Sequence, residues 1–252
     1  MPFYKDGWNF NHSAENESKL RPLCEQVEQH FELPAGRLYR YFARTDDPSL
    51  SQIHGEHYRG FYCHISERNW LPTYFYHFLY RPDYVGDTFE DALAFDDLIF
   101  VRHSTCADIV GCAITYAHEL QHFVQHGSTP RLLRANNALY QNWRKFEETV
   151  TAIDVPSERE ANIVSKRVAE AVCGTDAVRS FAEKQVRLMQ ELGNPEQQLQ
   201  KWIFFRDVPS STPYDLAKNT LPIVERFKTL INFNEFGLKV DQPDWWVGPL
   251  ED

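Results

Sequence analysis

The feature that most constrains the fold is a change of hydrophobic pattern near residue 107. Before it, short aromatic runs rich in β-favouring residues are bounded by Gly, Pro and Asp. After it, apolar residues recur at helical spacing. We therefore predict an α+β protein in which an aromatic-rich N-terminal antiparallel sheet packs on a mainly helical body.

The predicted strands are residues 37–44, 58–65, 73–81 and 98–102. Most segments between them are too short for crossover helices, which favours an antiparallel sheet. The predicted helices are residues 107–126, 131–149, 157–173, 177–192, 195–205 and 213–231. Gly127, Gly174 and Gly193 each follow a helix, where a left-handed C-cap is favoured. Ser157 and Glu160 have capping-box spacing.

Charge, hydropathy and cysteine usage exclude several classes of protein. The formal net charge of -10 disfavours nucleic acid as a partner. No apolar stretch approaches the roughly 20 residues that span a bilayer, so no membrane helix is expected. The N-terminus lacks the pattern of a secretory signal. The five cysteines form no Cys-x-x-Cys pair, which predicts neither a disulfide framework nor a cysteine zinc site and fits a reducing cytoplasm.

The segment with the clearest chemical pattern is residues 109–126, IVGCAITYAHELQHFVQH. It contains His118-Glu119-Leu120-Gln121-His122, the His-Glu-x-x-His pattern. Residues i and i+4 lie on one helix face, so His118 and His122 can bind one ion at Zn–N distances of about 2.0–2.1 Å. Glu119 lies about 100° further around the helix, beside that ion, where a general base is needed. The structural alternative is a buried helix whose histidines form ordinary hydrogen bonds.

A catalytic zinc keeps three protein ligands and one open position, so a third ligand is required. The metzincin continuation is excluded, because Gln125 and Ser128 stand where Gly and His are needed. Downstream, Glu158 and Asn162 have the same i, i+4 spacing as the histidines. We predict that Glu158 is the third ligand and that Asn162 orients Glu158 or a histidine.

His118-Glu119-x-x-His122 followed by Glu158-x-x-Ala161-Asn162 resembles the gluzincin metallopeptidases, in particular the HtpX-type proteases and the cytosolic ImmA/IrrE group. The resemblance covers about residues 97–173. It implies that His118, His122 and Glu158 bind Zn²⁺ and that Glu119 is the base. Residues 98–102 resemble the edge strand along which such enzymes hold an extended peptide. We accordingly predict one zincin-like domain over residues 1–252, sheet-rich at 1–103 and helical at 104–252.

Other residues are weaker candidates for the same site. Glu160 serves the predicted capping box and is the alternative third ligand. Glu147 and Glu148 are a further fallback, with a solvated helix face as the favoured interpretation. His126 lies one turn past His122, where a contact with the helix C-terminal dipole is favoured over metal binding. The group His54, Glu56 and His57 is interpreted mainly as surface, with a second metal or a substrate contact as the alternative.

The remaining predictions concern the reaction and the chain end. An oxyanion donor is sought in residues 206–214, where Tyr214 and Arg206 are the candidates. Trp245 and Trp246 are expected to pack back onto the body. The predicted function is zinc-dependent hydrolysis of a peptide or protein substrate, and the acidic chain favours a basic one. The alternatives are a zinc-binding but non-proteolytic regulatory or scaffold protein, and a purely structural protein without metal.

Overall fold

The computed structural model describes residues 7–10, 14–35, 38–43, 59–64, 95–147, 150–193 and 196–250. The predicted strand at 73–81 lies outside these residues, as do His54, Glu56, His57 and Glu148. The chain divides into two compact units, Met1–Phe123 and Val124–Asp252. The boundary falls inside one continuous helix, α6 (Ile109–Ser128).

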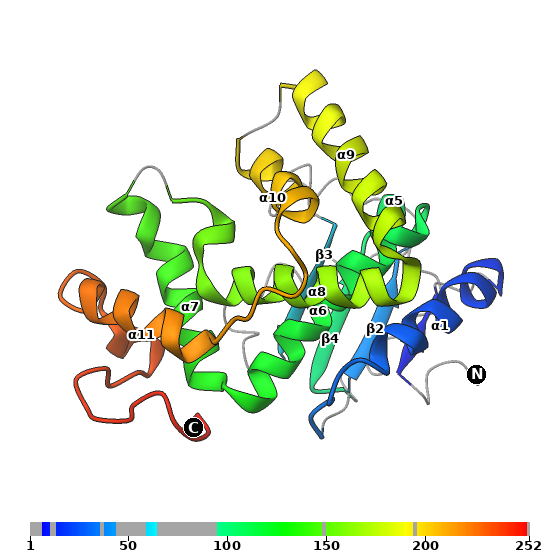
Figure 1. Cartoon of the computed structure of the whole chain (residues 1–252). Helices are drawn as coiled ribbons and strands as arrows, with labels where there is room; N and C mark the ends of the chain where they lie inside the picture. Colours follow the sequence, from blue (N-terminus) through cyan, green and yellow to red (C-terminus); the bar gives the residue numbers. More distant parts are fainter. Residues whose placement is uncertain are drawn as a thin grey trace, which may run out of the picture. The chain divides into compact units, whose positions relative to one another are not determined.

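The first unit contains a mixed sheet of four described strands in the order β1-β2-β4-β3 (Figure 1). The strands are β1 (Trp8–Asn9), β2 (Leu38–Phe42), β3 (Gly60–His64) and β4 (Asp97–Val101). Strands β1, β2 and β4 are parallel, and β3 is antiparallel to β4. The predicted antiparallel arrangement is therefore wrong for most of the sheet. The strand predicted as the edge, β4, lies between β2 and β3, so the outer strand on that side of the described sheet is β3.

A helix that the sequence pattern did not predict explains the parallel pairing. Helix α1 (Ala14–Glu28) connects β1 to β2 and supplies the crossover that a parallel pair requires. Its sequence is mostly polar and contains Pro22, which hides its helical period. Its buried residues, Leu20, Cys24 and Val27, nevertheless repeat at helical spacing.

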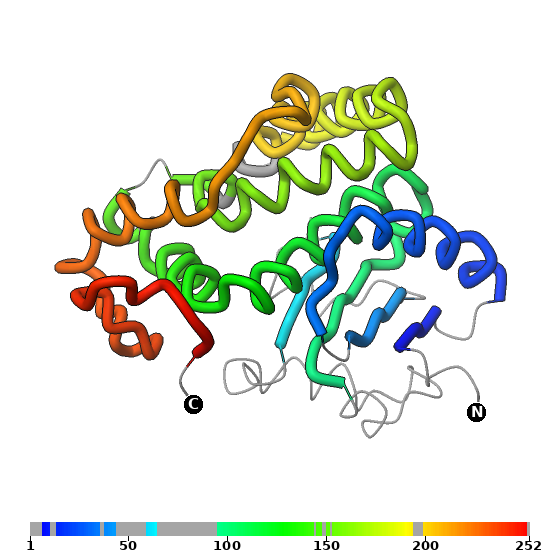
Figure 2. The backbone as a smooth tube through the Cα atoms, turned by 60° about the horizontal axis from the view of Figure 1, so that its bottom comes forward, coloured from blue at the N-terminus to red at the C-terminus, as the bar shows by residue number. Residues whose placement is uncertain are grey.

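Helices α1 and α6 lie on the same face of the sheet (Figures 1 and 2). The buried Tyr116 of α6 joins them, because its hydroxyl donates a hydrogen bond to Glu28 of α1 and accepts one of 2.8 Å from Arg40 of β2. The Tyr116 ring also lies 5.9 Å, centroid to centroid, from the ring of Phe42. Since strand side chains alternate between faces, Arg40 and Phe42 identify which residues of each strand face α6.

The second unit is helical. After the last turns of α6 it contains α7 (Pro130–Asn142), α8 (Pro156–Cys173), α9 (Thr175–Glu191), α10 (Glu196–Asp207) and α11 (Leu216–Phe227), while the short α5 (His103–Cys106) belongs to the first unit. All six predicted helices are present, most with ends within a few residues of the predicted ones. Helix α7 stops at Asn142, earlier than predicted, and a 3₁₀ turn at Trp143–Lys145 follows.

The predicted helix ends are confirmed in two of three cases. Gly174 follows α8 with φ 91° and Gly193 follows α9 with φ 61°, a region that favours glycine. Gly127 is not a cap, because α6 continues through it to Ser128. Beyond Gly127, the hydroxyl of Ser128 donates to the carbonyl of Val124 at 2.7 Å, so a side chain satisfies a helix-end carbonyl that a glycine cap would otherwise serve.

The predicted capping box is also wrong. Helix α8 begins at Pro156 with Val155 as its N-cap, and Ser157 lies inside the first turn. Proline suits this first position, because its missing N–H would have no partner within the helix. The Ser157 N–H instead donates to Oδ1 of the buried Asn136 on α7 at 3.2 Å.

The core of the second unit joins α7, α11 and the C-terminal segment. Its members include Leu132, Leu139, Phe227, Phe233 and Trp245. Trp245 is 8% exposed and Trp246 packs against the same cluster, which confirms that the tryptophan pair folds back. Arg131 fixes this segment by donating to the carbonyl oxygens of Trp245 and Pro249.

Polar contacts also stabilise α8 and α10. The Nζ of the buried Lys166 on α8 donates to the carbonyl oxygens of Phe205 and Val208, both at 2.5 Å.

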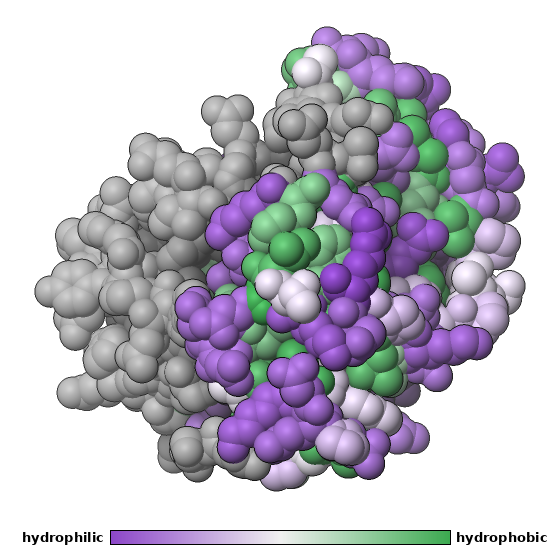
Figure 3. Space-filling view, turned by 90° about the vertical axis from the view of Figure 1, so that its left-hand side faces the viewer, coloured by the Kyte–Doolittle hydropathy of each residue, from purple (hydrophilic) through white to green (hydrophobic). Residues whose placement is uncertain are grey.

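Hydrophilic residues make up most of the coloured surface in Figure 3. No described helix has both the length and the apolar character needed to cross a membrane.

Candidate metal centre

The His-Glu-x-x-His residues lie on a buried face of α6. The exposed fractions of His118, Glu119 and His122 are 5%, 7% and 9%. The Nε2 atoms of the two histidines are 3.2 Å apart, and their ring planes are at 83°. Two nitrogens at 2.0–2.1 Å from one tetrahedral ion would be about 3.3 Å apart, so this pair fits a shared zinc without rearrangement.

Glu119 lies on the side of α6 that faces β3. A Cβ built on Gly60 would be 3.5 Å from Cγ of Glu119, 2.8 Å from Cγ2 of Thr115 and 2.6 Å from the carbonyl oxygen of Phe100. A glycine is therefore needed where β3 passes over the general-base candidate. Burial lowers the pKa of the neighbouring Arg59 to about 10, and its Nε donates to Oγ1 of Thr115 at 3.3 Å.

The start of α8 is held against the last turns of α6. Gln125, which is 1% exposed, donates from Nε2 to the carbonyl oxygen of Ser157 at 3.1 Å and to Oε2 of Glu160 at 2.8 Å. Gln125 follows His118 and His122 at the i, i+4, i+7 spacing of one helix face. Glu158 lies between the two residues that Gln125 binds. The carboxylate of Glu160, the alternative ligand, therefore already accepts a hydrogen bond from the side-chain amide of Gln125.

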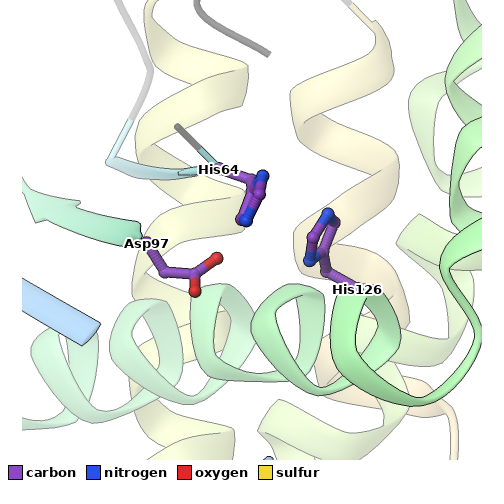
Figure 4. A group of neighbouring side chains, drawn as sticks. All are labelled: His64, Asp97 and His126. Carbon is purple, nitrogen blue, oxygen red and sulfur yellow. The ribbon is translucent and has the colours of Figure 1, made fainter. Parts of the chain in front are cut away.

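Among the described residues, ligand atoms come within 4.8 Å of one another in two groups, His118 with His122 and Glu158, and His64 with Asp97 and His126. The first group consists of the three predicted ligands. The second was not predicted as a group. His64 lies near the end of the predicted strand 58–65, Asp97 directly precedes the predicted strand 98–102, and His126 was considered alone. Its members come from β3, β4 and α6 and point toward one another (Figure 4).

Asn162 is 1% exposed, and its Oδ1 has no hydrogen-bond partner within the described part of the chain. A buried amide oxygen without a donor is costly, by about 1–3 kcal/mol. Such an acceptor suits the predicted orienting role, because a metal-bound histidine normally donates its second ring N–H to a nearby oxygen.

The candidates for an oxyanion donor differ in their surroundings. Tyr214 is half-buried, and burial raises the pKa of its hydroxyl, while Arg159 lowers it and Glu160 raises it. These two neighbours directly follow Glu158 in the sequence, so Tyr214 lies near the first turns of α8, and its hydroxyl stays protonated as a donor at neutral pH. Arg206 instead forms an exposed bidentate pair with Asp207.

The fallback ligand Glu147 is engaged elsewhere. Its carboxylate accepts a hydrogen bond from Nε1 of Trp143 at 3.2 Å and pairs with Arg226. Two buried amides that join helices were not predicted from the sequence. Gln125 entered only in excluding the metzincin pattern, and Asn136 was not considered. The available signal was an amide at a core position of a helix, where a buried polar group needs a partner.

The chain was compared with protein-family models, with curated proteins and with solved structures, and none of the three comparisons gave a match.

Proposed function

We propose that this protein is a zinc-dependent peptide hydrolase whose metal is held by His118, His122 and Glu158. The observation that carries the proposal is the buried histidine pair with its Nε2 atoms 3.2 Å apart and a glutamate beside it in the sequence. Two imidazoles and a carboxylate are a usual set of zinc ligands that leaves one position open for water or substrate.

The side chains divide the reaction among them. Bound zinc would act as the Lewis acid that polarises the peptide carbonyl and lowers the pKa of water. Glu119 takes a proton from the attacking water and then passes it to the leaving amine. Tyr214 donates a hydrogen bond to the oxyanion of the tetrahedral intermediate. Asn162 is assigned an orienting role, in which its Oδ1 would accept the second ring N–H of a metal-bound histidine.

The substrate is proposed to be an extended peptide lying along β3. This strand is the outer one on its side of the described sheet, and its Gly60 lies beside Glu119. An extended segment that pairs with an outer strand gains main-chain hydrogen bonds irrespective of its side chains. The formal net charge of -10 favours basic segments.

The experiment measures zinc content by elemental mass spectrometry and hydrolysis of a denatured, fluorescently labelled protein on the same samples. The variants are Glu119→Gln and Glu158→Ala, with Glu191→Gln, on the exposed end of α9, as the control. We expect Glu119→Gln to retain zinc and lose activity by about 10²–10⁴-fold, which is the range of general acid–base catalysis. Glu158→Ala should lose the activity and the ion held by His118, His122 and Glu158, and the control should lose neither.

Two outcomes would contradict the proposal in different ways. Zinc in the parent without hydrolysis would favour the non-proteolytic regulator or scaffold. A parent that takes up no zinc when the ion is offered would leave a structural protein whose histidines form ordinary hydrogen bonds.

A further inference from the structure

We propose that His64, Asp97 and His126 form a second site for a divalent cation of the zinc type, separate from the site of His118 and His122. Their ligand atoms lie within 4.8 Å of one another, and Figure 4 shows both rings and the carboxylate directed toward a common space. Two imidazoles and one carboxylate are again a zinc-like ligand set.

The register of the sheet places His64 and Asp97 together. They are direct partners in the antiparallel pair of β3 and β4, at the end of the ladder. Asp97 is also the partner of Leu38 in β2. Leu38, Arg40 and Phe42 alternate onto one face of the sheet, the face on which Arg40 contacts Tyr116 of α6. Asp97 and His64 therefore both project toward α6.

His126 lies near His64 and Asp97 because two residues along a strand cover nearly the same distance as one turn of a helix. Every second residue of β3 faces α6, at steps of about 6.6 Å, close to the 5.4 Å of one helical turn. Gly60 lies against Glu119, and the ring of Tyr62 lies 6.2 Å from that of Phe123. The next step along both elements pairs His64 with the turn that contains His126. Because α6 is one unbroken helix, this pairing follows from the contacts that precede it.

Asp97 has the surroundings of an oriented metal ligand. It is 6% exposed, and the hydroxyl of Tyr62 donates to its Oδ1 at 2.6 Å. Carboxylates that bind metal are usually fixed by such a bond. Tetrahedral coordination needs ligand atoms about 3.3 Å apart, so the group closes by at most about 1.5 Å on binding, which is within the reach of side-chain rotation.

The two sites share no ligand. His126 is displaced by one turn, about 6 Å along the axis, from His122. The proposed ion would therefore bind independently and connect β3 and β4 to the last turn of α6. Its effect on the proposed reaction would be indirect, through the position of β3 beside Glu119.

The experiment uses the full chain, stripped of metal by a chelator and dialysed against Zn²⁺, with bound zinc counted by elemental mass spectrometry. The variants are His64→Gln and His126→Gln, both at partly exposed positions, with His118→Gln for the other site. The control is His103→Gln, at an exposed position of α5. Circular dichroism verifies that each variant is folded.

We expect two zinc ions per parent chain, one in His64→Gln, one in His126→Gln, and two in the control. His118→Gln should retain the ion of the second site. The parent could instead bind a single ion that is lost in His64→Gln and His126→Gln but retained in His118→Gln. That result would support the second site and contradict the proposed hydrolase site. The inference is overturned if folded His64→Gln and His126→Gln bind as much zinc as the parent.

Discussion

The amide of Gln125 offers the sharpest test of how the proposed metal centre is positioned. Gln125→Ala removes a side chain that is 1% exposed and donates both to the carbonyl of Ser157 and to the carboxylate of Glu160. A neutral hydrogen bond contributes about 0.5–1.5 kcal/mol and one to a charged group about 1.5–3 kcal/mol. The metal-free variant should therefore lose about 2–4 kcal/mol of unfolding free energy. Zinc affinity should fall by about 10–100-fold, as for other residues that orient ligands.

The assay is urea unfolding of the metal-free protein followed by circular dichroism, with zinc affinity measured by competition with a chromophoric chelator. Gln190→Ala, at an exposed position of α9, is the matched control and should be neutral in both. Glu160→Gln keeps an acceptor for Gln125 but loses its charge, so it should cost about 1 kcal/mol. A Gln125→Ala protein within about 0.5 kcal/mol of the parent, with unchanged zinc affinity, would refute the positioning role.

Two further predictions test the second unit. Lys166→Met removes the donor of two carbonyl oxygens from a side chain that is 5% exposed, and should lower the unfolding free energy by about 2–4 kcal/mol, whereas Lys184→Met, at an exposed site, should be neutral in the same urea titration. Trp245→Ala empties a core position of the C-terminal segment and should cost about 3–5 kcal/mol, against less than about 1 kcal/mol for Val247→Ala, whose side chain is 53% exposed. Equal losses within either pair would contradict the packing described.

Helices α7, α8, α9 and α11 could be predicted because each buries one apolar face, and the spacing of that face can be recognised within the segment itself. In α11, for example, the buried residues Leu216, Thr220, Val224 and Phe227 follow the helical spacing. The end of α6 could not be predicted from Gly127 alone. The helix instead continues to Ser128, whose hydroxyl donates to the carbonyl oxygen of Val124.

The sheet was harder, because strand order and direction are not local properties. The strands at β2, β3 and β4 were located by their aromatic content, but their pairing depends on α1, whose polar sequence concealed the crossover. For the same reason, the group of His64, Asp97 and His126 could not be predicted from the sequence. The sequences of β3, β4 and α6 do not indicate, taken one at a time, that β3 pairs with β4 and runs beside α6.

The arrangement of α6 explains why the His-Glu-x-x-His pattern indicated only some of the candidate functional residues of this helix. His118, His122 and Gln125 share one face of the helix, and Gln125 donates hydrogen bonds to the start of α8. Glu119, Phe123 and His126 form the adjacent face, and Gly60 and Tyr62 show that it meets β3. The helical period determines which residues share a face, so the i+7 members of both faces were accessible from the sequence. Which element packs against each face depends on the tertiary structure. That element decides whether Gln125 can act as a positioning residue and whether His126 can be a candidate metal ligand.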